Sequence, residues 1–270
     1  MPNKVIKLIA LDIDGTIMNK NYRISNRIKH AVEKAIKKGV YVLVATGRMY
    51  SATVPIGLEL GLKTPLVVYQ GSMVREFYKS DDILLHHMIN SELSYQLVED
   101  LRKENIQINV YCDDKLYTES DSPMLQEYVT RRKIPFQELE SFGDIKNFLP
   151  TKIMAMDPDI TKVDAIKQKL QEKYSDKLNI TKSTDYFLEF VDIKCSKAGA
   201  ILFLAERWGI QQHEIMAVGD QDNDRGMIEI AGFGIAMGNS HNDLKQAADY
   251  VTDTVDNDGA ALAIEKFVLS

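Results

Sequence analysis

Cysteine, tryptophan and clustered positive charge are scarce in this sequence of 270 residues, and the scarcities argue against whole classes of protein. The two cysteines, Cys112 and Cys195, are far apart and form no C-x-x-C pattern, so we expect free thiols in a reducing cytoplasm. The formal net charge is -6 and no lysine or arginine run occurs, which argues against a nucleic-acid surface. The apolar stretch near Met1 is too short for a membrane span, and no H-x-x-x-H pair suggests a zinc site.

Short apolar runs carry most of the structural signal. Six of them are continuous enough to predict buried strands: residues 5–11, 40–45, 66–69, 215–218, 233–237 and 250–251. Apolar residues at helical spacing follow Ser25, a predicted helix N-cap, and follow Lys197. Together these segments predict a parallel α/β domain in two pieces, residues 1–82 and 194–270.

Residues 83–193 have a different character from the segments on either side. Shorter and more mixed strands are predicted at 107–111, 116–118, 152–156 and 186–191. Helices are predicted around 91–104, 123–132 and 161–174. This pattern predicts a separate α+β unit, with two helices on one antiparallel sheet, inserted between the halves of the first domain.

Two carboxylates, Asp12 and Asp14, stand directly after the first apolar run and before Gly15. Carboxylates that close repel each other unless a shared proton or a cation relieves them, and Mg²⁺ favours oxygen ligands of this kind. The other interpretation is an ordinary Asp-Gly turn, or part of a calcium loop, because D-x-D-G resembles one. The rest of the sequence favours a Mg²⁺ site at these two carboxylates over a turn or a calcium loop.

Other polar residues follow the predicted strands in the same way. Thr46-Gly47 follows the second strand, Asp220 follows the strand at 215–218, and Lys197 opens a helix. Ligands of an open parallel sheet bind beyond the carboxyl ends of its strands, so we expect these groups to converge. Each has a plainer explanation: a turn, a solvated lysine, or a calcium loop at 220–224. The calcium loop fails because its sixth position is Arg225 instead of glycine.

The combination predicts phosphoryl transfer, in which an anionic substrate needs positive charge and an in-line nucleophile. Asp12 is the expected nucleophile, and Asp14 the general acid and base. A Mg²⁺ held by Asp12 and Asp220 would screen the repulsion between carboxylate and phosphate. Phosphate oxygens would be held by a small set of donors: Thr46, the Gly47 amide and Lys197.

The chain resembles the haloacid-dehalogenase-like phosphatase superfamily in four ordered motifs: Asp12-Ile-Asp14-Gly-Thr16, Thr46-Gly47-Arg48, Lys197 and Gly219-Asp220-Gln-Asp-Asn223-Asp224. The insertion between the second and third motifs looks like the Cof-type branch with its C2-class cap, close to bacterial sugar-phosphate phosphatases. The resemblance implies a Rossmann-like core, residues 1–82 and 194–270, and a mobile cap, residues 83–193, that reads the leaving group.

The resemblance also implies roles for single residues. Mg²⁺ would be held by the Asp12 side chain, the Asp14 main-chain carbonyl and the Asp220 side chain. Phosphate contacts would come from the Ile13 amide, Thr46, Gly47, Lys197 and Asn223. Asp224 would orient the metal shell or Lys197. The expected activity is Mg²⁺-dependent hydrolysis of small phosphorylated metabolites, sugar phosphates in particular, through an aspartyl-phosphate.

Two residues depart from the family pattern. Gln70 replaces a common asparagine after the third strand, and Arg225 replaces a small or apolar residue, which is neutral only if it lies on the surface. Specificity is unassigned. The segment 182–189 is a candidate contact with the leaving group and is equally a normal hairpin edge. Two further functions stay open: a phosphomutase, and a regulatory protein that binds a metabolite on a phosphatase scaffold.

Overall fold

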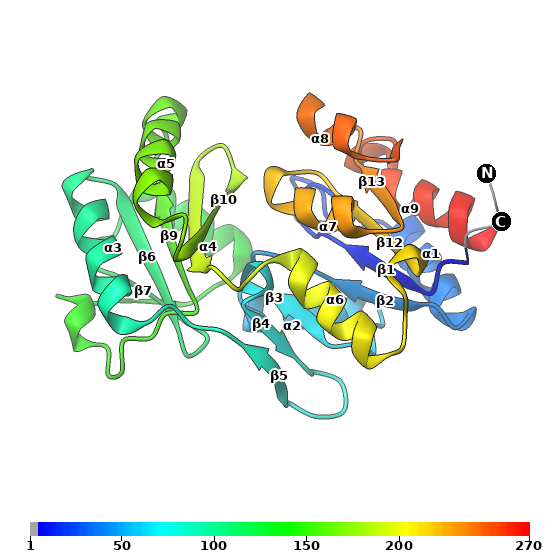
Figure 1. Ribbon diagram of the computed structural model, residues 1–270, viewed down its shortest axis with the longest axis horizontal. Coiled ribbons are helices and arrows are strands. Elements are labelled where there is room, and N and C mark those ends of the chain that lie inside the picture. Colours follow the sequence, from blue (N-terminus) through cyan, green and yellow to red (C-terminus); the bar gives the residue numbers. More distant parts are fainter. Residues whose placement is uncertain (1–4) are drawn as a thin grey trace.

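The computed structural model describes residues 5–270, which form two units side by side (Figure 1). The core is built on a parallel sheet of five strands in the order β14-β13-β12-β1-β2. Their bounds are β1 (Leu8–Leu11), β2 (Tyr41–Val44), β12 (Ile215–Gly219), β13 (Phe233–Ala236) and β14 (Tyr250–Val251). The first strand was predicted from residue 5, but it begins at Leu8 because Val5 is 66% exposed and lies outside the sheet.

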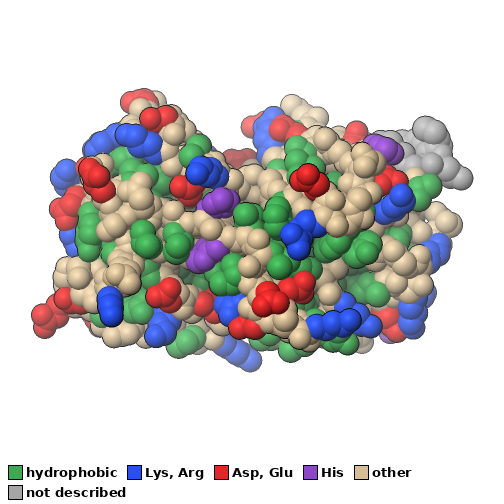
Figure 2. Space-filling view, turned by 60° about the horizontal axis from the view of Figure 1, so that its bottom comes forward, with side chains coloured by type: hydrophobic (Ala, Val, Ile, Leu, Met, Phe, Trp, Pro, Cys, Tyr) green, Lys and Arg blue, Asp and Glu red, His purple; other side chains and the backbone are tan. Residues whose placement is uncertain are grey.

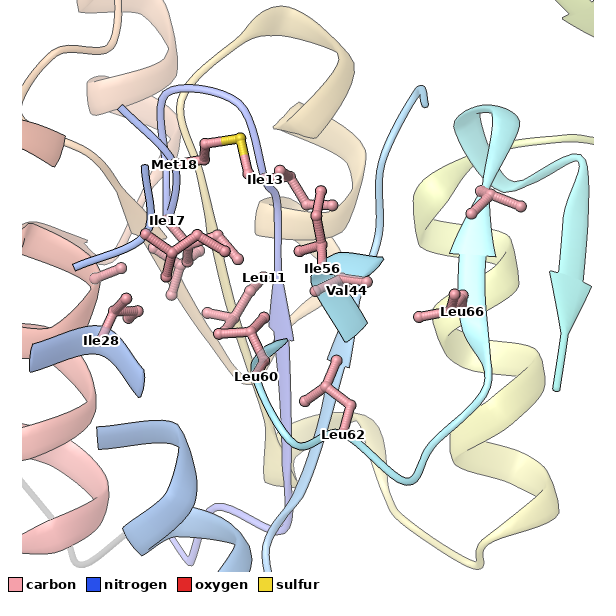
Figure 3. Packing of buried hydrophobic residues seen from close by; sticks show 14 of the residues in the cluster. Leu11, Ile13, Ile17, Met18, Ile28, Val44, Ile56, Leu60, Leu62 and Leu66 are labelled. Atoms are coloured by element: carbon pink, nitrogen blue, oxygen red, sulfur yellow. The ribbon is translucent and has the colours of Figure 1, made fainter. Parts of the chain in front are cut away.

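Both faces of this sheet are covered, as the continuous apolar runs predict. Ile9 and Leu11 of β1 point to one face, which is packed by α1 (Asn26–Lys37), α2 (Tyr50–Glu59) and α9 (Gly259–Ile264). Figure 3 shows part of this cluster around Leu11. Leu8 and Ala10 point to the other face, packed by α6 (Lys197–Arg207) and α7 (Arg225–Ile230). A further short helix, α8 (Asn242–Ala247), lies beside α7.

A small antiparallel sheet joins the open edge of the core. It contains β3 (Leu66–Val68), β4 (Met73–Arg75) and β5 (Ile83–His86), and one bridge between Ala45 and Val67 connects β3 to the chain after β2. The chain turns between β3 and β4 at Gln70-Gly71. Both residues have positive φ there, and a Cβ on Gly71 would lie 2.1 Å from the Ser196 carbonyl oxygen.

The cap contains six strands in the order β10-β11-β9-β6-β7-β8. Their bounds are β6 (Gln107–Cys112), β7 (Lys115–Thr118), β8 (Phe136–Glu138), β9 (Lys152–Met156), β10 (Leu178–Thr184) and β11 (Phe187–Asp192). The predicted antiparallel pairing is confirmed for β6, β7, β9 and β11, whereas β8, which was not predicted, pairs with β7 in parallel. The pairing is possible because α4 (Pro123–Arg132) lies between these two strands and returns the chain to the same end.

Helices cover both faces of the cap sheet. α3 (Ser91–Lys103) and α5 (Ile160–Tyr174) cover one face, where they pack on Ile108, Val110 and Ile153. The third helix, α4, packs on the opposite face in a cluster that continues into the core. The cap face that carries α4 is therefore the one that packs against the core.

Charged side chains of both signs are scattered over the face in Figure 2, with apolar atoms between them. Within residues 5–270, no helix combines the length and the apolar character that crossing a bilayer requires.

Candidate active site

The carboxyl ends of β1, β2 and β12 bring Asp12, Thr46 and Asp220 to one edge of the core sheet, as expected for a parallel sheet. The Asp12 amide donates to the Val218 carbonyl at 3.0 Å, which ties the end of β1 to β12. The next turn passes directly over Asp220. A Cβ added to Gly15, whose φ is +84°, would lie 2.2 Å from the Asp220 Oδ2 atom.

Lys197 reaches this edge from the first turn of α6. The Ser196 hydroxyl accepts from the Gly199 amide at 2.9 Å and so fixes where the helix begins. The Lys197 Nζ atom then donates to Asp12 Oδ1 and to Asp224 Oδ1, each at 2.6 Å, and all three side chains are buried. Burial alone would lower the pKa of Lys197, but the two carboxylates outweigh it and raise that pKa.

Asp12, Asp220 and Asp224 form a buried acidic cluster, with one oxygen of each within 4.8 Å of the others. Burial, together with the neighbouring Asp224, raises the pKa of Asp12 well above its usual value and that of Asp220 to about 7. Asp224 also accepts from the Asp220 and Gln221 amides through Oδ2, at 2.9 and 3.1 Å. A hard divalent cation fits this set, since it takes carboxylate oxygens and relieves their repulsion.

Asp14 lies beside Arg48, a residue of the Thr46-Gly47-Arg48 motif for which no role was predicted. The guanidinium donates to both carboxylate oxygens, from Nε at 2.7 Å and from Nη2 at 2.6 Å. Burial acts to raise the pKa of Asp14, but the hydrogen bonds and charge of Arg48 outweigh it and hold that pKa below its usual value. The carboxylate is thereby fixed in one orientation at the mouth of the site.

The predicted phosphate donors surround the same space. In the part of the chain that the structure describes, neither the Ile13 nor the Gly47 amide donates to a protein acceptor. The Thr46 hydroxyl oxygen accepts from the Arg48 amide at 3.2 Å, so its own proton is available to a ligand. Asn223 is arranged differently, because its Nδ2 donates to Gln70 Oε1 at 3.1 Å.

A buried polar network from the cap was not anticipated. Lys152 of β9 donates to the Gly47 carbonyl at 2.6 Å and to Glu189 Oε2 at 3.0 Å, and its ion pair with Glu189 of β11 is almost wholly buried. Gln70 joins this network by donating to Glu189 Oε2 at 2.9 Å, and the Ser183 hydroxyl donates to Glu189 Oε1 at 2.5 Å. The signal in the sequence was a lysine at the start of the apolar strand β9 and a glutamate inside the apolar run of β11.

Both departures from the family pattern now have a structural setting. Gln70 links Asn223 of the core to Glu189 of the cap, so it belongs to the site. Arg225 pairs with Glu229 at 2.7 Å, and both side chains are about half exposed, so it lies on the surface. The candidate segment 182–189 contributes Ser183, Thr184, Phe187 and Glu189 to the wall of the catalytic cavity.

The catalytic cavity adjoins a larger cavity of about 920 Å³, which is lined by cap residues and, from the core, by Tyr22. The two cavities share four lining residues, Tyr128, Arg132, Thr184 and Phe187. Tyr128 and Arg132 come from α4 and were missed in the sequence, where they were indistinguishable from surface positions of an amphipathic helix. These four side chains therefore lie on the boundary of the two cavities.

The fold and the ordered motifs define a class of protein. Residues 9–264 match the family model described as haloacid dehalogenase-like hydrolase, and the chain belongs to this family. The phosphatase YwpJ of Bacillus subtilis is 30% identical over 281 residues, covering 95% of this chain and 98% of that protein. The 5-amino-6-(5-phospho-D-ribitylamino)uracil phosphatase YcsE, also of Bacillus subtilis, is 32% identical and covers 98% and 96%.

Solved structures show the same fold along the whole chain. A haloacid dehalogenase-like hydrolase from Bacteroides thetaiotaomicron is 32% identical, with a TM-score of 0.84 over 97% of this chain and 99% of that one. The α/β core with a separate cap is therefore the family architecture. The chain is an enzyme of the phosphoric monoester hydrolase class, a haloacid dehalogenase-like phosphatase that acts on small phosphorylated compounds.

Proposed function

We propose that this enzyme hydrolyses phosphate monoesters of small cytoplasmic metabolites, sugar phosphates in particular, with Mg²⁺ and through a phosphoryl group carried on Asp12. The supporting observation is the position of Asp12, buried at the end of β1 with Lys197 on one oxygen and Asp220 nearby. We place Asp12 and Asp14 as catalytic residues and the Cof-type cap at residues 83–193.

In the first step, an Asp12 oxygen attacks phosphorus and the ester oxygen leaves. Lys197 holds Oδ1, so Oδ2 is the oxygen free to attack. The Ile13 and Gly47 amides, Thr46, Lys197 and Asn223 surround the transferred group and stabilise its charge. Asp12, the Asp14 carbonyl and Asp220 would hold Mg²⁺, which supplies charge neutralisation between the carboxylate and the phosphate when bound.

Asp14 serves both half-reactions. In the first half-reaction its protonated carboxyl group gives a proton to the leaving oxygen, a role that Arg48 opposes because it holds the pKa of Asp14 below its usual value. In the second, the carboxylate removes a proton from the water that attacks the aspartyl-phosphate. Arg48 supports this second role, because it holds the carboxylate form in a fixed orientation. The other side of the site is closed by Lys152, Glu189 and Gln70. This closure limits the access of bulk water to the phosphoryl group when the cap is packed against the core.

A second substrate class has an observation in its favour. The larger cavity of about 920 Å³ is walled by aromatic side chains, Tyr22, Tyr128, Tyr186 and Phe187. Rings of this kind stack on planar heterocycles as well as on the apolar faces of sugars. A polyol phosphate that carries a pyrimidine, the substrate named for the relative YcsE, is therefore the alternative substrate for this chain.

The test is phosphate release from a panel of sugar phosphates and from the pyrimidine-bearing ribityl phosphate, with Mg²⁺ or with chelator. Asp12→Asn nearly preserves shape but removes the nucleophile's charge, so we expect turnover to fall by at least about 10⁴-fold. Asp222→Asn is the matched control, because this aspartate lies in the Asp220–Asp224 loop with its side chain exposed. That variant should retain its activity.

Each outcome discriminates between functions. Equal activity of wild type and Asp12→Asn would contradict the aspartyl-phosphate route. Isomerised sugar phosphate without free phosphate would identify a phosphomutase. A folded wild type that binds the metabolites but releases no phosphate would identify a regulatory protein.

A further inference from the structure

Arg132 has no role in the chemistry just described, yet its guanidinium lies on the wall of the catalytic cavity. It is the last residue of α4, and Lys133 ends the helix there in the left-handed conformation. The Cζ atom of Arg132 lies 4.4 Å from the ring centroid of Tyr128, 5.5 Å from that of Tyr22 and 5.9 Å from that of Phe187. Three rings from three different segments therefore surround one cation.

The aromatic rings fix the guanidinium without using its hydrogen-bond donors. A ring face attracts the cation electrostatically and leaves the N–H groups at its planar edge free. Over residues 5–270, no side-chain hydrogen bond and no ion pair is found for Arg132. A half-buried guanidinium in this state has unused donors, and Arg132 lines the catalytic cavity.

Among the described residues, the other cations that line or back these cavities have ion-pair partners. Arg131, on the larger cavity, pairs with Glu127 at 2.6 Å. Arg48, the other cation on the catalytic wall, is neutralised by its two bonds to Asp14. Lys152, behind Glu189, is neutralised by that carboxylate. Arg132 lines both cavities, so it lies between the predicted phosphate site at Asp12 and the larger cavity.

We propose that Arg132 is a specificity-determining residue, which binds a second anionic group on the leaving group of the substrate, a carboxylate or a second phosphate. A planar guanidinium held by rings matches either group through two parallel N–H bonds. The inference rests on the proposed phosphatase function and adds to it a preference for phosphate esters of acids, or for bisphosphates, over esters of neutral polyols.

The experiment compares substrates that differ only in this group. The first pair is 6-phosphogluconate, which has a terminal carboxylate, and sorbitol 6-phosphate, which has a hydroxymethyl group in its place. The second pair, fructose 1,6-bisphosphate and fructose 6-phosphate, tests the effect of a second phosphate. Wild type should have the higher kcat/KM for the acidic member of at least one pair, and the pair that responds identifies carboxylate or phosphate. Arg132→Gln should reduce that preference at least about tenfold, the effect of losing charge-assisted hydrogen bonds.

Arg207→Gln is the matched control. Arg207 is also the last residue of its helix, and it also stacks on an aromatic residue four positions earlier, Phe203, at 5.5 Å. It lies on the exposed surface, so its substitution should leave the preference unchanged. Arg132→Lys keeps the charge without the planar fork and should restore only part of the preference.

Three outcomes would overturn the inference: no preference in wild type, no change in Arg132→Gln, or an equal loss on both members of a pair. The last would place Arg132 on the scissile phosphate instead. Calorimetric binding to Asp12→Asn separates this inference from the proposed function, because it needs no turnover. If Asp12→Asn binds the acidic ligand more tightly than the neutral one, and the double variant with Arg132→Gln does not, the inference is supported even if the wild type releases no phosphate. Equal binding of the two ligands by Asp12→Asn would refute it.

Discussion

At the scale of single residues, Gly15 and Gly39 have nearly the same backbone conformation but different surroundings. Their φ angles are +84° and +82°. A Cβ on Gly15 would meet Asp220 Oδ2 at 2.2 Å, whereas a Cβ on Gly39 would meet nothing within 4 Å. The pair therefore separates the cost of a left-handed conformation from the cost of disturbing the acidic cluster.

Alanine at either position should lower the free energy of unfolding by about 1–2 kcal/mol, because both substitutions place a Cβ on a left-handed backbone. Gly15→Ala should in addition lose most phosphatase activity, since the methyl group displaces Asp220, while Gly39→Ala should keep it. Urea denaturation and phosphate release measure the two effects. Equal activity of the two variants would show that the close packing of Gly15 on Asp220 has no part in catalysis.

At the scale of elements, α3 and α5 are joined across the cap by one carboxylate. Asp100 of α3 accepts from Lys173 and from the Tyr174 hydroxyl of α5, and from Lys103 of its own helix. Burial acts to raise the pKa of Asp100, but these hydrogen bonds outweigh it and lower the pKa to about 2. The helices are thus held together most strongly when this side chain is ionised.

The sign of the pH dependence follows from that lowered pKa. The stabilisation by Asp100 is fully present above the pKa of the unfolded chain, near 3.9, and is lost as the pH falls towards 2. Asp100→Asn should therefore be less stable than wild type by about 1–2 kcal/mol at pH 7, with the gap closing below pH 4. Thermal and urea unfolding across this range measure it.

Asp164→Asn supplies the control for this measurement. Asp164 also lies on α5 and pairs with Lys182, but its side chain is 57% exposed, and an exposed pair contributes at most about 1 kcal/mol. A pH-independent gap for Asp100→Asn, or an equal effect of Asp164→Asn, would contradict the stabilising role of Asp100.

At the scale of the whole molecule, the cap is fastened to the core at a second place, away from the Lys152–Glu189 network. The β6–β7 turn carries Asp113 and Asp114, both with positive φ. Asp114 accepts from the Ser51 amide at 3.1 Å, at the start of α2, and from the Tyr69 hydroxyl at 2.6 Å. Among the described residues of the core, no side chain accepts from the free amides at the start of α2, whose N-cap residue is Met49. Asp114 of the cap domain takes that place.

Asp114→Gly should remove this attachment while preserving the turn, because glycine accepts positive φ. We expect a loss of stability of about 0.5–2 kcal/mol, the usual cost of a lost N-cap, and faster hydrogen exchange in the first turn of α2. Asp113→Gly, the neighbouring change in the same turn, should show neither effect. Unchanged exchange in Asp114→Gly would mean that the turn does not hold the cap down.

Local sequence signals determined the core strands and the residues at their carboxyl ends. Asp12, Thr46 and Asp220 were predictable because each directly follows a continuous apolar run, and parallel strands end at one edge. The insertion between the halves of the core was visible as a change from continuous to mixed apolar patterns. α2 was not predicted, since Pro55 interrupts its pattern, and neither was the parallel partnership of β8 with β7.

Tertiary structure alone decided which side chains meet in the site and how the cap completes it. The Arg48–Asp14 pair joins residues 34 positions apart, and Gln70 meets Glu189 across 119 positions. Arg132 is enclosed by rings from three segments. The spacing of these segments along the chain follows no helical or strand period, so no sequence pattern links them. Strand formation and strand ends depend on neighbours within a few residues, so the local sequence predicts both. Contacts between the cap and the core depend on how two separately packed units meet, and only the folded chain specifies that.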